Sequence, residues 1–207
     1  LPPHPERRKT TTKRQEFPMT LTNRDCPKDL TACLFTGHRE LPQGTELDSL
    51  QERTKEALRL AYFKGCRQFY VGGAMGFDML AAIAVLNLRE ELPGIHLILA
   101  LPHFGHYQRW NKTDKAVFAR ILERADRVLY LSKEYCPGCM QARNRYMVDH
   151  AQYCICYCGK ATGGTAYTVR YARKKGVQIV NLWEKTERTE KNFPKIRFPI
   201  DFFGQLW

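Results

Sequence analysis

The sequence has no apolar run that approaches the roughly 20 residues a membrane-spanning helix requires, and it has no internal repeat. Its first stretch, LPPHPERRKTTTKRQEF, is basic and polar and lacks the apolar core of a secretory signal. We therefore expect neither a membrane protein nor a secreted one. What is present, 43% hydrophobic and 26% charged residues in a chain of 207, is the composition of a globular domain.

Acidic residues are also few. The chain has 33 Lys and Arg against 21 Asp and Glu, which gives a net charge of +12. Such a surplus attracts polyanions, so nucleic acid stays among the partner classes, although nucleotides and phosphorylated metabolites need far less charge. We expect residues 1–30 to form a basic, disordered tail. The first 18 lack apolar periodicity and are left out of the fold prediction.

The eight cysteines do not pair in an obvious way. Cys154, Cys156 and Cys158 alternate with other residues as in a strand, and one face of a strand cannot join neighbouring cysteines. CPGC at 136–139 has the spacing of a zinc or redox pair, but no second pair at ligand spacing accompanies it. We favour reduced cysteines, no metal and no cofactor, and therefore a cytoplasmic protein.

From residue 31 onward, short apolar runs alternate with helical patterns. The apolar runs predict buried strands at 31–37, 68–73, 95–102, 127–132, 153–159 and 177–182. Apolar residues at helical spacing predict helices at 45–65, 77–91, 111–125, 139–151 and 164–175. This alternation implies right-handed crossovers and a Rossmann-like α/β fold, a three-layer sandwich with a mostly parallel sheet, over residues 31–183. We expect residues 184–207 to be a surface extension.

Glycine-containing loops follow three of the predicted strands, at 36–39, 72–78 and 159–165. The carboxyl ends of parallel strands share one edge of the sheet, where ligands bind in such folds. Glycines let backbone N–H groups approach an anion, and a following helix N-terminus adds partial positive charge. Tight strand-to-helix packing is the alternative explanation, but three converging loops favour an anion site. GGAMGFD fits neither GxGxxG nor a Walker A loop, which weakens the ordinary NAD and ATPase readings.

Four segments strengthen this prediction. FTGHRELP, VGGAMGFDMLAA, ARNRYMVDHA and GGTAYTVRYARKKG occur in this order. Together they resemble the SLOG superfamily, which includes the DNA-processing protein DprA/Smf and the lonely-guy phosphoribohydrolases, and in particular its YpsA-like branch. The resemblance covers about residues 31–182. It implies a Rossmann-like fold that binds nucleotides or nucleotide derivatives.

The resemblance also implies ligand-binding positions on each loop. In the last loop the glycines and Thr165 would hold phosphate, and Asp78 would accept from sugar hydroxyls or a base. Thr168 is added because its hydroxyl could also donate. The predicted ligand-binding residues are Gly37, His38, Arg39, Gly72, Gly73, Gly76, Asp78, Arg143, Asn144, Gly163, Gly164, Thr165 and Thr168.

One departure bears on catalysis. The last loop of lonely-guy enzymes resembles PGGxGTxxE, whose glutamate serves cleavage of the N-glycosidic bond. Here residues 163–169 read GGTAYTV, without an acid, and Asp78 could substitute only from another loop. We therefore name no catalytic residue and favour a nucleotide-binding sensor or signalling module. A nucleotide or nucleoside N-glycoside hydrolase or transferase comes second, and a DprA-like single-stranded DNA binder third.

Two further side chains have two interpretations each, and a pair of arginines has one. His38 is either a packed histidine or a general base in the first loop. Trp110 is either a cap on the sheet edge or a stacking platform for a base. Arg143 and Arg145 are two apart on a predicted helix and cannot share a face, so we expect only Arg143 to enter the site.

Overall fold

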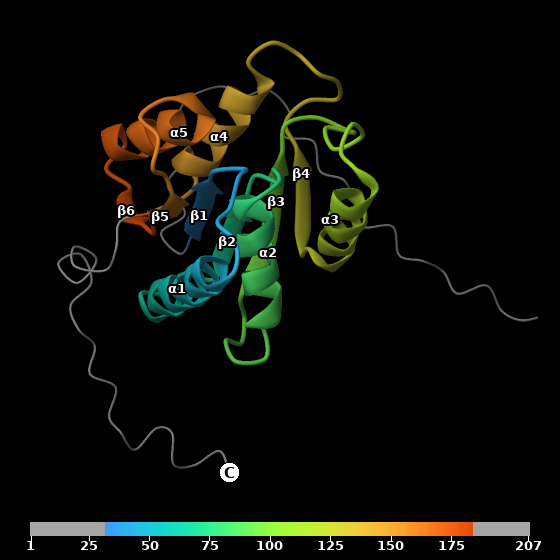
Figure 1. The fold of residues 1–207 in the computed structure, drawn as a ribbon. Helices are drawn as coiled ribbons and strands as arrows, with labels where there is room; N and C mark the ends of the chain where they lie inside the picture. Colours follow the sequence, from blue (N-terminus) through green and yellow to red (C-terminus); the bar gives the residue numbers. More distant parts are fainter. Residues whose placement is uncertain (1–31, 184–207) are drawn as a thin grey trace, which may run out of the picture.

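A computed structural model describes residues 32–183 (Figure 1), so the predictions for the two tails lie outside the described residues. Six strands form one sheet in the order β4-β3-β2-β1-β5-β6. Their bounds are β1 Ala32–Gly37, β2 Gln68–Val71, β3 His96–Leu101, β4 Arg127–Tyr130, β5 Tyr153–Tyr157 and β6 Gln178–Asn181. Every neighbouring pair is parallel, which confirms the predicted parallel sheet.

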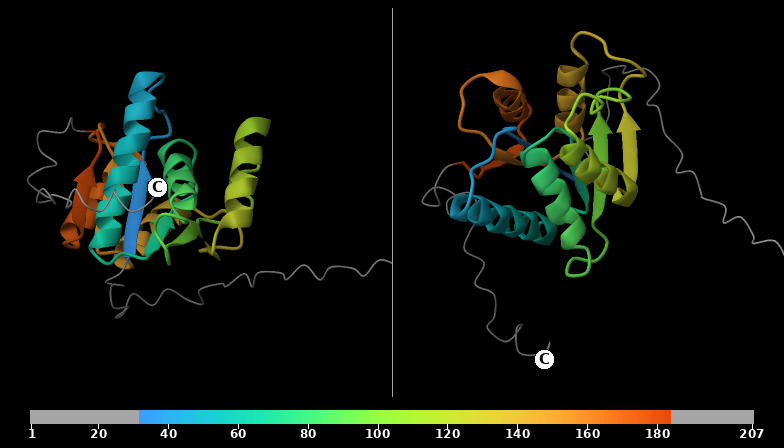
Figure 2. Two further views of the ribbon diagram at one scale, coloured as in Figure 1. Left: turned by 90° about the horizontal axis from the view of Figure 1, so that it is seen from below. Right: turned by 45° about the vertical axis from the view of Figure 1, so that its right-hand side comes forward.

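Five helices cover the sheet, and their bounds are α1 Thr45–Phe63, α2 Phe77–Asn87, α3 Lys112–Arg124, α4 Cys139–Asp149 and α5 Gly163–Lys174. Figures 1 and 2 show α1, α2 and α3 on one face and α4 and α5 on the other. The predicted three-layer Rossmann-like architecture is thus confirmed. Helix α2 ends at Asn87, four residues before its predicted end at 91, and residues 88–91 form turns.

The alternation of side chains along the central strands builds two cores. Phe35 of β1 packs with Phe69 and Phe77 on the α1–α3 side, whereas Leu34 lies on the α4–α5 side. Cys154 and Cys156 point into the α4–α5 core, as their spacing predicted. Complete burial of a phenylalanine contributes about 1.5–3 kcal/mol, so the sheet is held firmly from both faces.

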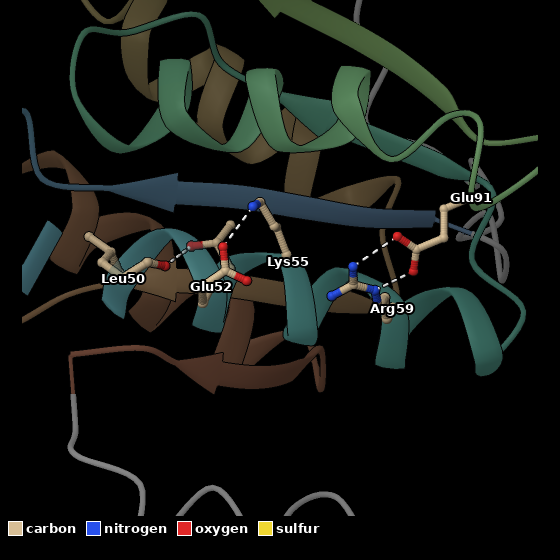
Figure 3. A network of polar contacts seen from close by, with 6 residues as sticks. Leu50, Glu52, Lys55, Arg59 and Glu91 are labelled. Carbon is tan, nitrogen blue, oxygen red and sulfur yellow. Dashed lines mark hydrogen bonds and ion pairs between the residues drawn. The ribbon is translucent and has the colours of Figure 1, made fainter. Parts of the chain in front are cut away.

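Outside the cores, one ion pair ties α1 to the segment after α2, and a second lies within α1 (Figure 3). Arg59 of α1 donates to both carboxylate oxygens of Glu91, which follows α2, at 2.5 and 2.8 Å. Lys55 pairs with Glu52 one turn earlier on the same helix, at 2.7 Å. These pairs are largely exposed, so each contributes at most about 1 kcal/mol.

The strand order decides where a ligand can bind. From β1 the chain adds strands in one direction as far as β4, and then returns to place β5 on the other side of β1. The topological switch point therefore lies between β1 and β5. In open α/β sheets the crevice beyond the carboxyl ends of these two strands is the usual ligand site.

Within residues 32–183 no helix is long and apolar enough to cross a bilayer. The same residues contain no group of three or more His, Cys, Asp or Glu side chains that could hold a metal ion. None of the seven cysteines within residues 32–183 forms a disulfide.

Candidate functional site at the switch point

His38 joins the two strands of the switch point. Its Nε2 accepts a hydrogen bond from the backbone N–H of Gly159 at 2.8 Å and lies 3.3 Å from the N–H of Lys160. Its own backbone N–H donates to the carbonyl of Tyr157, and its carbonyl accepts from Phe77. Partial burial and, after it, the charge of Lys160 lower the pKa of the imidazole, which favours the neutral form that accepts. Of the two predicted roles, the structure places His38 in the packed, positioning one.

A second link joins α5 to β1. The Thr165 hydroxyl donates to the carbonyl of Gly37 at 2.8 Å. The Thr168 hydroxyl donates to the carbonyl of Gly164 at 2.8 Å, and Thr168 is completely buried. The structure therefore brings Thr165 to the junction but keeps Thr168 inside the protein, away from any ligand. Sequence reasoning could not separate the two, because both lie in the first turns of one helix.

The first turn of α5 is open. Gly163 has a φ of +93°, and a Cβ added to Gly163 or Gly164 would meet no described atom within 4 Å. In the described structure the N-cap residue, Thr162, makes no side-chain cap, and the first turn holds no acidic residue. The unpaired backbone N–H groups of this turn thus keep their partial positive charge.

In the first and second loops, the positions that require glycine are crowded rather than open. A Cβ at Gly37 would collide with the Phe77 ring, and one at Gly76, whose φ is +77°, would collide with the backbone of Arg39. Gly72 is crowded by the Arg143 side chain, and Gly73 by Leu101. Tight packing therefore explains these glycines. Of the glycines in the three loops, only Gly163 and Gly164 face open space.

Arg143, Asn144 and Asp78 form a buried cluster beneath the second loop. The Arg143 guanidinium donates to the carbonyl of Gly72 and, through Nε, to Oδ1 of Asn144 at 2.6 Å. Asp78 is 5% exposed, and its Oδ2 accepts from the N–H of Ala74 at 3.2 Å. Burial raises the pKa of Asp78 and lowers that of Arg143, and each charge opposes the shift of the other. The cluster supports the loop from below and does not reach the open side.

Arg143 and Arg145 lie on different faces of α4, as their spacing predicted. Arg143 is buried, whereas Arg145 is exposed and donates to the hydroxyl of Tyr167 at 3.0 Å. The two side chains therefore lie on different faces of the helix. Arg143 lies under the second loop, where its Nε and Nη1 donate to Asn144 and Gly72, and its contact with a ligand stays a prediction.

Sequence reasoning missed Trp183. Its ring stands edge-on to His38 at 5.5 Å and lies 4.8 Å from the Tyr157 ring. A Cβ on Gly159 would collide with it, and 46% of the residue is exposed. Trp183 thus borders the switch point with part of its surface uncovered. No local signal identifies it, because the contact joins residues at opposite ends of the domain.

Trp110, the other tryptophan within residues 32–183, lies where a cap on the sheet edge was one of its two predicted roles. Trp110 packs against Phe118 at 5.2 Å and against His106 at 5.6 Å, at the margin of the core beneath α3. Sequence reasoning also missed His106, whose Nε2 lies 2.9 Å from the Gly73 carbonyl. Burial lowers the pKa of His106 to about 4. Both residues cap the sheet edge near β2 and β3, away from the switch point.

The described cavity, of about 680 Å³, lies elsewhere. It runs between α1 and α2 toward α3, and of the predicted site residues it touches only Arg39 and Gly76. Its lining is mainly apolar, from Leu41, Leu47, Met79, Leu80, Ile83 and Val117. Helix α5 does not contribute to it. The cavity and the switch point are therefore separate features of the surface.

Two curated proteins are similar in sequence to this chain. The chain is 29% identical over 119 residues to the uncharacterized SPbeta prophage-derived protein YoqJ of Bacillus subtilis, which covers 52% of this chain and 70% of that protein. It is 30% identical over 94 residues to a UPF0398 protein of Staphylococcus epidermidis, 44% of this chain and 50% of that protein. The chain thus spans only half the length of the second relative.

Two solved structures share the fold. DprA from Streptococcus pneumoniae superimposes with a TM-score of 0.51, over 72% of this chain and 49% of that one. DprA from Helicobacter pylori, described for its single-stranded DNA binding mode, gives 0.52 over 73% and 64%. Both are 19% identical to this chain, so they support the fold alone. Residues 33–182 match the sequence model of the family described as YpsA, the YspA SLOG family, and the chain therefore belongs to that family.

Proposed function

We propose that this protein binds a nucleotide or a nucleotide derivative at the switch point between β1 and β5, as a cytoplasmic sensor or signalling module. The observation that carries the proposal is the hydrogen bond from Gly159 to His38, which brings the loops after β5 and β1 together at 2.8 Å. This junction lies where α/β sheets bind ligands. The free thiols of the described cysteines are in keeping with a reducing compartment.

The open turn of α5 is the part that takes the phosphate. Backbone N–H groups of Gly164 and Thr165 lie in the uncapped first turn, where an anion gains both hydrogen bonds and the helix dipole. Lys160 is exposed on the same loop and adds a positive charge, which the Glu40 carboxylate 3.5 Å away partly offsets. The half-exposed Trp183 ring offers a stacking surface for a base.

Binding without turnover is favoured over glycoside cleavage. Cleavage of an N-glycosidic bond needs a carboxylate beside the sugar. Residues 158–169 contain no acid, and the Asp78 carboxylate is buried and used by the Ala74 N–H. A hydrolase would therefore need a carboxylate from another loop, such as the exposed Glu40, which pairs with Lys160 at 3.5 Å.

The test is calorimetric titration with a panel of nucleotides, dinucleotides and nucleotide sugars. For a nucleotide that binds, Gly164→Asp places a carboxylate where the phosphate lies, and we expect affinity to fall at least about tenfold, or 1.4 kcal/mol. Gly164→Ala is the matched control: its Cβ enters open space, so affinity should stay within about threefold. Circular dichroism confirms that each variant is folded.

Two outcomes would contradict this proposal. One is that no member of the panel binds, and the other is that folded Gly164→Asp binds as tightly as the parent. If chromatography detects free base released from a bound nucleotide, the result would instead favour the hydrolase or transferase.

A second candidate is single-stranded DNA binding. It is favoured by the net charge of +12 and by the fold shared with the Helicobacter pylori protein described for binding single-stranded DNA. Attraction by a basic surface alone weakens steeply between low and physiological salt. An affinity for single-stranded DNA that increases with oligonucleotide length and persists at physiological salt would favour DNA over a mononucleotide as the ligand.

A further inference from the structure

The cavity between α1 and α2 is an apolar groove that the described chain leaves open. Ile83 of α2, 39% exposed, is one of the four large hydrophobic residues exposed in the described region. Beside it lie Met79 and Leu80 of α2 and Leu47 of α1. A volume of about 680 Å³ is within the range of sites that hold a ligand or a peptide side-chain cluster. A surface of this kind marks an interaction site.

The sequence supplies an apolar segment outside the described residues. Residues 193–207 read FPKIRFPIDFFGQLW, in which eight of fifteen residues are Phe, Ile, Leu or Trp. Ile196, Phe198, Ile200 and Phe202 alternate with polar residues or proline. Alternation with a period of two places all four side chains on one face of an extended chain. The prolines at 194 and 199 disfavour a helix, so the extended form is the amphipathic one.

The position of Trp183 brings this segment within reach of the groove. Trp183 lies against His38, and the neighbouring residues Arg39 and Leu41 line one end of the groove. Arg53 of α1 donates to the carbonyl of Leu182, so the chain leaves the domain alongside α1. Residues 184–192, EKTERTEKN, contain no apolar side chain. Nine extended residues span about 30 Å, more than twice the width of a helix, about 10–12 Å.

We propose that residues 193–207 dock as an extended strand of chain in the groove between α1 and α2 of the same molecule, with Ile196, Phe198, Ile200 and Phe202 against Met79, Leu80 and Ile83. The rim of the groove suits the polar residues of the segment. Arg39 and Lys55 are positive and Glu40 and Asp114 are negative, so both Asp201 and the basic pair Lys195 and Arg197 have partners of opposite sign. This site is separate from the switch point and does not depend on nucleotide binding.

Limited digestion of the full chain with trypsin under single-hit conditions tests the docking. Lys195 and Arg197 lie in the segment, whereas Lys185, Arg188 and Lys191 lie in the connecting stretch and serve as internal references. Docking predicts that cleavage at 195 and 197 is at least about tenfold slower than at 188, because a site must open before it is cut. Mass spectrometry identifies each first cut.

Variants on both sides of the contact sharpen the test. Ile83→Asp should bring cleavage at 195 and 197 to within about threefold of cleavage at 188. Phe202→Ser should do the same while it leaves the groove unchanged. Tyr135→Asp is the control, since Tyr135 is 69% exposed and lies outside the groove, and it should preserve the protection.

Three results would overturn the docking. The first is equal cleavage in the segment and the connecting stretch of the parent chain. The second is protection that survives both Ile83→Asp and Phe202→Ser, which would place the segment elsewhere. The third is protection that disappears on dilution, which would assign the groove to the segment of a second copy.

Discussion

His38 accepts, through Nε2, a hydrogen bond from the backbone N–H of Gly159 across 2.8 Å and 121 positions of sequence. The bond requires an unprotonated Nε2, and partial burial together with Lys160 lowers the pKa of this histidine accordingly. Thr165 makes the second connection, to Gly37. Two hydrogen bonds thus hold the loops after β1 and β5 and the start of α5 in one arrangement before any ligand arrives.

Replacement of Thr165 by valine should loosen this arrangement measurably. The variant keeps the shape of the side chain but removes the hydroxyl that donates to Gly37, at a cost of about 0.5–1.5 kcal/mol in the free energy of unfolding. Urea denaturation measures the loss. Thr165→Ser retains the hydroxyl and is the control; a valine variant as stable as the parent would show that the bond adds nothing to stability.

The buried cluster beneath the second loop should behave as a unit. Arg143→Met removes the cation beside Asp78 and leaves the acceptors of Gly72 and Asn144 unpaired, so we expect a loss of about 3–5 kcal/mol. In the Asp78→Asn background the same change should cost less, because no uncompensated carboxylate remains. A double-mutant cycle from urea denaturation measures the coupling, expected at about 0.5–3 kcal/mol. Strictly additive losses would contradict the cluster.

We expect His106 to make the free energy of unfolding depend on pH. It is buried and neutral in the folded protein, with a pKa of about 4, whereas the unfolded chain takes up this proton near pH 6.5. The unfolded state therefore binds more protons between these values, and the free energy of unfolding falls as the pH falls, by up to about 1.4 kcal/mol per pH unit. The raised pKa of Asp78 acts with the opposite sign, but it is common to parent and variant.

Denaturation of the parent and of His106→Phe across this range isolates the contribution of the histidine. The variant has no proton to take up at position 106, so its stability should change less steeply from pH 6.5 to about 4. Parallel curves for the two proteins would mean that His106 titrates normally in the fold.

The cysteines should differ in their reaction with a thiol reagent. In a Cys26→Ser background, which removes the cysteine outside the described residues, Cys136 is exposed and should react first. Cys158 is half-buried with a raised pKa, so it should follow more slowly. The remaining thiols should react only after unfolding: Cys33, Cys66, Cys139, Cys154 and Cys156. Equal rates for Cys136 and Cys139 would instead indicate a reactive CPGC pair.

Sequence reasoning was most successful where burial repeats along the chain. Short apolar runs predicted the six strands, because a strand covered on both faces is apolar throughout, and apolar residues at helical spacing predicted the five helices. Alternation within residues 153–158 assigned Cys154 and Cys156 to one face of β5. The end of α2 was predicted four residues too late, because residues 88–91, LREE, favour a helix by themselves although they form turns in the structure.

The sequence by itself determined the parallel α/β architecture, the loops that end on one edge of the sheet, and the family. Only the tertiary structure decided that β5 lies beside β1, that Trp183 borders His38, and that Thr168 and Arg143 face inward. It also placed the apolar groove between α1 and α2, apart from the switch point. The physical reason is that periodicity reports which face of an element is buried, whereas neighbours distant in the chain are chosen by packing of the whole domain.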